Sequence, residues 1–292
     1  MTATTIRHPA VAGRFYPADP QVLRSEVRAY LSLVSSHATS KPTSPVTLPK
    51  APSHAVGCIA PHAGYMYSGH VAGAVFAELK IPELCVVLCP NHTGLGHPLA
   101  INSEGAWETP LGDVPIDSEF AAALKQRFPL LHEDTAAHRS EHAAEVELPF
   151  LQTLQPKLRF VPIALGTGQL EILAPLGEIL ADVIATCNSE VLIVASSDMN
   201  HYESDAVTRA KDHMAIEAIL RLDAPALYNV VTHQHVSMCG FGPAVAMLTA
   251  AKKLGATSAE LVKYATSGDI SGDRDLVVGY AGIRVTLGAA RS

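Results

Sequence analysis

Apolar runs that alternate with amphipathic segments are the main pattern along this chain of 292 residues. Runs of β-branched and aliphatic residues predict strands buried on both faces at 55–60, 84–89, 160–165, 191–195 and 276–285. Apolar residues at helical spacing predict helices at 21–34, 70–79, 118–128, 170–186, 205–220 and 224–231, and another that begins near Pro243. This alternation predicts an α/β protein with a mostly parallel sheet that helices cover on both faces.

One stretch interrupts the alternation. Residues 35–53 are rich in Ser, Thr and Pro and have no periodicity, which indicates an exposed loop rather than a boundary between domains. We therefore expect one α/β domain over residues 1–292, long enough to bury a large core. Residues 105–117, which carry Trp107, are expected to form a hairpin or an extended excursion.

Histidines follow several predicted strands at similar positions. His62, His92 and His201 each lie within a few residues of the carboxyl end of a different strand, and such ends meet at one edge of a parallel sheet. Cys239 lies just before the helix that contains Pro243, a position that stabilises a thiolate. Imidazole and thiolate ligands suit Fe(II), Cu or Zn rather than Mg or Ca. The sequence therefore predicts a shared metal site at this edge.

Other polar residues in the same loops are candidates for the site. Asp198 would serve as a ligand or as the acceptor that fixes the tautomer of a histidine. A helix that has begun by residue 142 would place His142 and Glu145 on one face. The alternative is a first-turn acid near the helix dipole with a histidine beside it. Four residues are further candidates for the pocket: Tyr65, Asn91, Glu141 and His142.

Composition narrows the classes of partner. The net charge of −7 and the lack of a basic run argue against nucleic acid and anionic membrane surfaces. No apolar run approaches the roughly 18 residues that span a bilayer, and the first residues lack the apolar core of a secretory signal. Five cysteines without a Cys-x-x-Cys pair argue against a disulfide framework and a zinc ribbon. We expect a cytoplasmic protein.

Several long motifs resemble the Memo family, in the right order and nearly from end to end. They are PAVAGRFYP at 9–17, APHAGYMYSG at 60–69, PNHTG at 90–94, TPLGD at 109–113, Glu141-His142 with Leu148-Pro149, SSDMNH at 196–201, Cys239-Gly240 and YATSGD at 264–269. The resemblance implies the LigB-like fold of the class III extradiol dioxygenases, which hold a non-haem iron at the carboxyl edge of the sheet. It also implies, as possible partners, the AMMECR1-like and radical-SAM proteins encoded beside bacterial Memo proteins.

The resemblance also implies roles for individual residues. The metal-site pattern of the family falls on His62, His92 and Cys239, with Asp198 and His201 lining the same pocket. The dioxygenases have a Glu ligand at the position that Cys239 occupies here. A thiolate donates more electron density and is itself oxidisable, which argues against ring cleavage. His201 matches the histidine that acts as acid and base in those enzymes.

Three functions from different classes follow. The first is a metal-dependent redox enzyme with Fe(II) or Cu, acting on an unknown small substrate, in which His201 is oriented by Asp198 and moves protons. The second is a non-catalytic binding module, because animal Memo proteins are associated with phosphotyrosine peptides. The pocket motifs contain no arginine that would grip a phosphate, which disfavours this module. The third is a metallohydrolase with a zinc-activated water.

Overall fold

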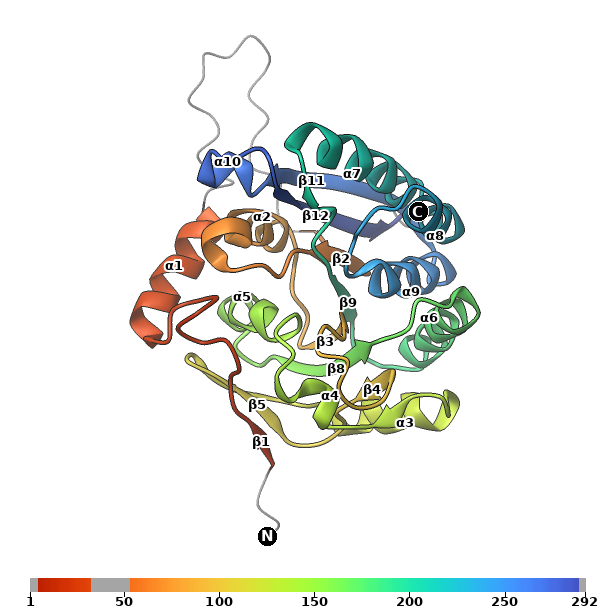
Figure 1. The fold of residues 1–292 in the computed structure, drawn as a ribbon. Helices are drawn as coiled ribbons and strands as arrows, with labels where there is room; N and C mark the ends of the chain where they lie inside the picture. Colours follow the sequence, from red (N-terminus) through yellow and green to blue (C-terminus); the bar gives the residue numbers. More distant parts are fainter. Residues whose placement is uncertain (1–4, 33–52, 289–292) are drawn as a thin grey trace.

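A large sheet forms the centre of the protein, and helices lie on both of its faces (Figure 1). The computed structural model describes residues 5–32 and 53–288. The loop expected at 35–53 therefore lies outside the described residues, apart from Ser53. The order of the strands in the sheet is β10-β12-β2-β9-β3-β8-β4-β7, and β11 pairs with β12.

Four parallel strands form the middle of this sheet. They are β2 (Gly57–Ala60), β9 (Val191–Ser196), β3 (Leu84–Pro90) and β8 (Arg159–Leu165). Each corresponds to an uninterrupted apolar run, as expected for strands buried on both faces. Ala60 pairs with Ser196, and Leu88 pairs with Ala195, so these strands end level with one another. The segments that follow them therefore emerge at one edge of the sheet.

The prediction of a mostly parallel sheet is wrong outside these four strands, because the whole sheet is mixed. On one side, β12 (Val277–Leu287) is antiparallel to β2, and β11 (Ala256–Thr266) and β10 (His201–Glu203) are antiparallel to β12. On the other side, β4 (Leu99–Ile101) is antiparallel to β8 and parallel to β7 (His132–Glu133). The chain between β11 and β12 contains only the short α10 (Gly268–Ser271), which is too little for the crossover that parallel strands need. An apolar run predicts that a strand is buried, but not whether it is parallel or antiparallel to its neighbours.

Helices cover both faces of the sheet, as expected. One face packs against α1 (Pro20–Ser32), α2 (Tyr65–Ala77) and α5 (Leu148–Leu154). The other packs against α3 (Ser118–Arg127), α6 (Leu170–Ala185), α7 (Asp205–Leu220), α8 (Ala224–His233) and α9 (Phe241–Lys253). Val86 and Leu88 contact one layer of helices, while Cys85, Val87 and Cys89 contact the other. This alternation along β3 is the period of two of a strand buried on both sides.

The N-terminal arm, residues 5–19 before α1, takes part in a small second sheet. This sheet consists of β1 (Ile6–Arg7), β5 (Ala106–Thr109) and β6 (Gly112–Pro115), and the last two form the expected hairpin, with Trp107 fully buried. The short α4 (Ala136–Arg139) and a 3-10 turn at Glu145–Glu147 link β7 to α5. No helix among residues 5–32 and 53–288 is long and apolar enough to cross a lipid bilayer.

Asp212 on α7 allows a prediction for the dependence of stability on pH. Its buried carboxyl accepts hydrogen bonds from the backbone N–H of Asn200 (2.8 Å) and the Tyr264 hydroxyl (2.7 Å), and burial raises its pKa to about 6. The native state thus holds this proton more tightly than the unfolded state does. The free energy of unfolding should therefore fall by roughly 3 kcal/mol as the pH rises from about 4 to above 6.

Asp212→Asn mimics the protonated acid. The free energy of unfolding of this variant, measured with urea, should therefore not show this decrease between pH 4 and 7. Asp113→Asn removes an exposed carboxylate and serves as the control. If the Asp212→Asn variant keeps the pH slope of the wild type, the raised pKa is not the cause.

Candidate metal centre

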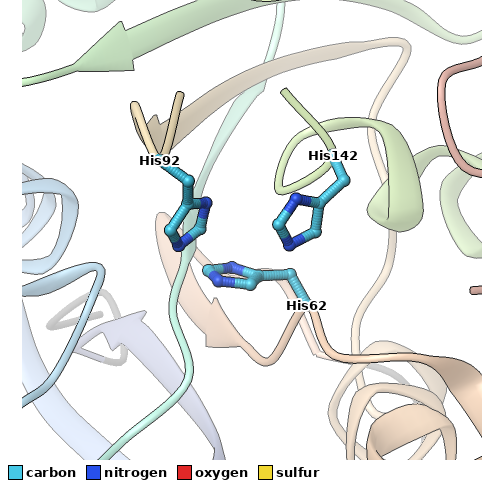
Figure 2. Close-up of side chains that lie close together, drawn as sticks. All are labelled: His62, His92 and His142. Carbon is cyan, nitrogen blue, oxygen red and sulfur yellow. The ribbon is translucent and has the colours of Figure 1, made fainter. Parts of the chain in front are cut away.

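Three histidine rings converge at the carboxyl edge of the central strands (Figure 2). His62 follows β2, His92 follows β3, and His142 comes from the segment between α4 and the 3-10 turn. Each offers one ring nitrogen, and these nitrogens all lie within 4.8 Å of one another. His62 is buried, His142 is half-buried and His92 is exposed at the pocket mouth. The group has the composition and spacing to hold a metal ion.

Hydrogen bonds around Ser196 fix the tautomer of His62. The Ser196 hydroxyl lies 2.8 Å from Nδ1 of His62, 2.7 Å from the Ala143 carbonyl and 2.9 Å from Oε1 of Glu147. The Ser196 proton goes to the carbonyl, which can only accept. Burial raises the pKa of Glu147 well above its ordinary value, which favours its protonated form, and a protonated carboxyl needs no proton from Ser196. His62 then donates from Nδ1, which leaves the lone pair on Nε2.

Burial also keeps the His62 ring neutral. Desolvation, followed by the nearby His92 and His142, lowers the pKa of His62 well below its ordinary range. A neutral imidazole is the form that coordinates a metal. The backbone N–H of His62 donates to Oδ1 of Asp198 at 2.8 Å, which fixes the chain at the end of β2.

Glu141 positions the other two histidines. Its buried carboxylate accepts from the backbone N–H (2.6 Å) and Nδ1 (2.9 Å) of His92, and from the backbone N–H of His142 (2.9 Å). Partial burial opposes the charged form of His92, but the hydrogen bond and charge of Glu141 outweigh it and raise the pKa of His92. Because Glu141 binds Nδ1, Nε2 of His92 is left for the pocket. The ring of His142 stacks on that of His92, with centroids 4.8 Å apart.

Cys239 lies beside this group but is not part of it. Its Sγ is 3.2 Å from Nε2 of His62 and 3.7 Å from the Asp198 carbonyl. It precedes Gly240, the N-cap of α9, where a Cβ would lie 2.3 Å from the Ser196 carbonyl, so glycine lets the cysteine approach β9. Burial, followed by the charge of Asp198, raises the pKa of Cys239 well above its ordinary value, which opposes the thiolate that the position before α9 favours.

His201 and Asp198 line the same pocket but do not form the expected pair. Nδ1 of His201 lies 2.9 Å from the Ser237 carbonyl, and its backbone N–H donates to the Ser237 hydroxyl at 2.8 Å. The residue that orients His201 is therefore Ser237. Asp198 instead accepts from the backbone of His62 and Ala63, and burial raises its pKa to about 7. Ser237 was missed because a serine in a loop carries no sequence signal.

Three other predicted features lie elsewhere. The hydroxyl of Tyr65 donates to the Val146 carbonyl at 2.7 Å inside the core, and Asn91 bonds within its own loop. The helix face expected for His142 and Glu145 does not form, because His142 precedes the 3-10 turn. Glu145 contacts the N-terminal arm instead. Glu147 was also missed, although a charged residue within the apolar run around Val146 and Leu148 is a detectable signal.

A cavity of about 580 Å³ opens over the histidines. Its lining combines the predicted groups with aromatic side chains that the sequence did not single out, and no lysine or arginine is among them. Tyr202, at its rim, is 73% exposed and has a φ of 59°. The lining residues are Phe15, His62, Ala63, Gly64, His92, His142, Asp198, His201, Tyr202, Ser237, Cys239, Val278 and Tyr280.

Fold and site together define an α/β protein with a histidine pocket that could hold a metal ion, at the carboxyl edge of four parallel strands. A family model described as Memo-like protein matches residues 7–284. A MEMO1 family protein of Methanopyrus kandleri is 44% identical over 283 residues, covering 95% of this chain and 98% of the relative. Another, of Methanothermobacter thermautotrophicus, is 41% identical over 281 residues, covering 94% and 99%. This chain belongs to the Memo family.

Proposed function

We propose that this protein is a metal-dependent redox enzyme acting on a small substrate, with Fe(II) or Cu held by His62, His92 and His142. The observation that carries the proposal is the group of three ring nitrogens with the Cys239 thiol 3.2 Å from Nε2 of His62. Nitrogen ligands with a nearby sulfur suit redox-active Fe and Cu. The cavity above the histidines leaves room for a substrate.

The residues around the metal would supply proton transfer. Fe(II) or Cu would contribute electron transfer with O₂ or a substrate. The Ser237 carbonyl accepts from Nδ1–H of His201, so Nε2 is the unprotonated position. Burial lowers the pKa of His201, which keeps the ring neutral and able to accept a proton. Asp198, with a pKa of about 7, can hold or release a proton near neutral pH.

We further propose the LigB-like arrangement for this site. Its support is the parallel order β2-β9-β3-β8 with His62 and His92 directly after β2 and β3. The residue that would stand in place of the dioxygenase Glu is Cys239, whose Sγ lies 3.2 Å from Nε2 of His62. An oxidisable sulfur in that place favours redox chemistry other than ring cleavage.

A zinc hydrolase is the second candidate, because three histidines with one open position also make up a catalytic zinc site. The pocket is less suited to a phosphopeptide. Its lining includes the carboxyl group of Asp198 and no lysine or arginine to pair with a phosphate.

Loading the anaerobically purified protein with Fe(II), Cu(I) or Zn²⁺ distinguishes the two candidates. With ascorbate as the electron donor, the Fe or Cu protein should consume O₂ faster than the same concentration of free metal. His201→Ala should lower this rate by about 100-fold without changing metal content. His233→Ala, which removes an exposed histidine at the end of α8, is the control. Hydrolysis of 4-nitrophenyl acetate by the Zn protein alone, with no excess O₂ consumption, would favour the hydrolase.

A further inference from the structure

We propose a second ligand site, for a small organic phosphate, in a separate cavity of about 540 Å³ beside the N-terminal arm. The cavity lies between the arm, which includes β1, and the segment around α4. It shares no lining residue with the histidine pocket. The two cavities are therefore distinct, although the charge of Arg14 acts on His142 of the histidine pocket.

The charge of this cavity is opposite to that of the whole chain. Arg7, Arg14 and Arg139 line it, and no aspartate or glutamate is among its lining residues. The chain as a whole carries a net charge of −7. Arg7 is paired with Glu145, so Arg14 and Arg139 supply the positive charge that attracts anions to this cavity.

Two of these arginines have free guanidinium groups. Arg14 and Arg139 are exposed, and their guanidinium groups make no hydrogen bond or ion pair within residues 5–32 and 53–288. Arg7 is different, because its guanidinium already binds Glu145 and two backbone carbonyls. The planar forks of Arg14 and Arg139 are thus the groups available to bind a phosphate bidentately.

His138 adds a buried polar group to the wall of the cavity. Its side chain is 1% exposed, and neither ring nitrogen makes a hydrogen bond within the described part of the chain. Burial, followed by the charge of Arg7, lowers the pKa of His138 to about 4, more than the backbone of Ala100 raises it, so the ring is neutral. The neutral His138 ring adds no positive charge to the wall, so the charge that attracts a phosphate comes from Arg14 and Arg139.

The size and lining of the cavity indicate an organic phosphate rather than the inorganic ion. Ile6, Pro9 and Val11 provide an apolar part of the wall, opposite in character to the arginines. Thr135 and Ser140 also line the cavity, and their hydroxyls can form hydrogen bonds with the polar part of a ligand. A volume of about 540 Å³ is within the range of pockets for small molecules.

Isothermal titration with ribose 5-phosphate, at constant ionic strength, tests this site. We expect one site per chain that binds ribose 5-phosphate more tightly than inorganic phosphate and does not bind ribose. Arg14→Ala and Arg139→Ala should each weaken binding by about 10-fold or more. Both side chains are exposed, so neither change should prevent folding. The matched control is Arg221→Ala, an exposed arginine that does not line the cavity.

Two further measurements test where the phosphate binds. The NMR signals of the His138 ring should shift with ribose 5-phosphate and not with ribose. His62→Ala should leave binding unchanged, because the histidine pocket is separate. The proposal is overturned if ribose 5-phosphate does not bind, if ribose binds equally well, or if Arg221→Ala weakens binding as much as Arg139→Ala does. Loss of binding in His62→Ala alone would place the ligand in the other pocket.

Discussion

His142→Ala is expected to lower the metal affinity of this protein by more than about 100-fold. Loss of a residue that only hydrogen-bonds to a metal ligand already lowers metal affinity about 10- to 100-fold, and loss of a ligand should lower it more. His62→Ala should have an effect of the same size, because both side chains belong to the group of ring nitrogens within 4.8 Å of one another. Cys239→Ala should have a smaller effect on affinity, because Cys239 lies beside the group of three ring nitrogens, 3.2 Å from Nε2 of His62. Metal content after anaerobic purification and titration against a chelator measure these changes.

The control for this series is His213→Ala, which removes an exposed histidine on α7. If Cys239→Ala loses the metal and His142→Ala keeps it, the ligands are His62, His92 and Cys239, the set that the family resemblance implies. Unchanged metal content in His62→Ala, His142→Ala and Cys239→Ala would exclude a metal centre in this pocket.

Arg7→Met should lower the free energy of unfolding by about 3–5 kcal/mol, because it leaves a buried carboxylate without its cation. Nη1 of Arg7 lies 2.6 Å from Oε2 of Glu145, whose side chain has no exposed surface. The same guanidinium donates to the carbonyls of His138 and Glu141 and lies over the Trp107 ring. Urea unfolding at pH 7 measures the loss.

Two further variants test the reason for this loss. Arg24→Met, at an exposed position of α1, should change stability by no more than about 0.5 kcal/mol. Adding Glu145→Leu to Arg7→Met should restore part of the stability, because it removes the unpaired charge. A loss below about 1 kcal/mol for Arg7→Met would mean that the hydrogen bonds from Tyr16, Ala10 and Val11 are enough to hold Glu145.

The central strands and most helices could be predicted because their signals are local. The apolar runs of β3 and β9 correspond to strands with every residue buried. The predicted start of α2 was five residues late, because the motif that begins the helix at Tyr65 is rich in glycine and aromatic residues. β7 and β10 are too short to produce a pattern. The antiparallel strands around the parallel core depend on pairing between distant segments, which hydrophobicity does not specify.

The sequence by itself determined that His62 and His92 lie close together, because each follows a buried strand and the ends of parallel strands meet at one edge. Only the tertiary structure decided that His142 completes the group, that Ser237 orients His201 and that burial raises the pKa of Cys239. These three facts depend on distances between loops and on burial. Both arise when distant parts of the chain pack together, and neither is encoded in the spacing of residues along it.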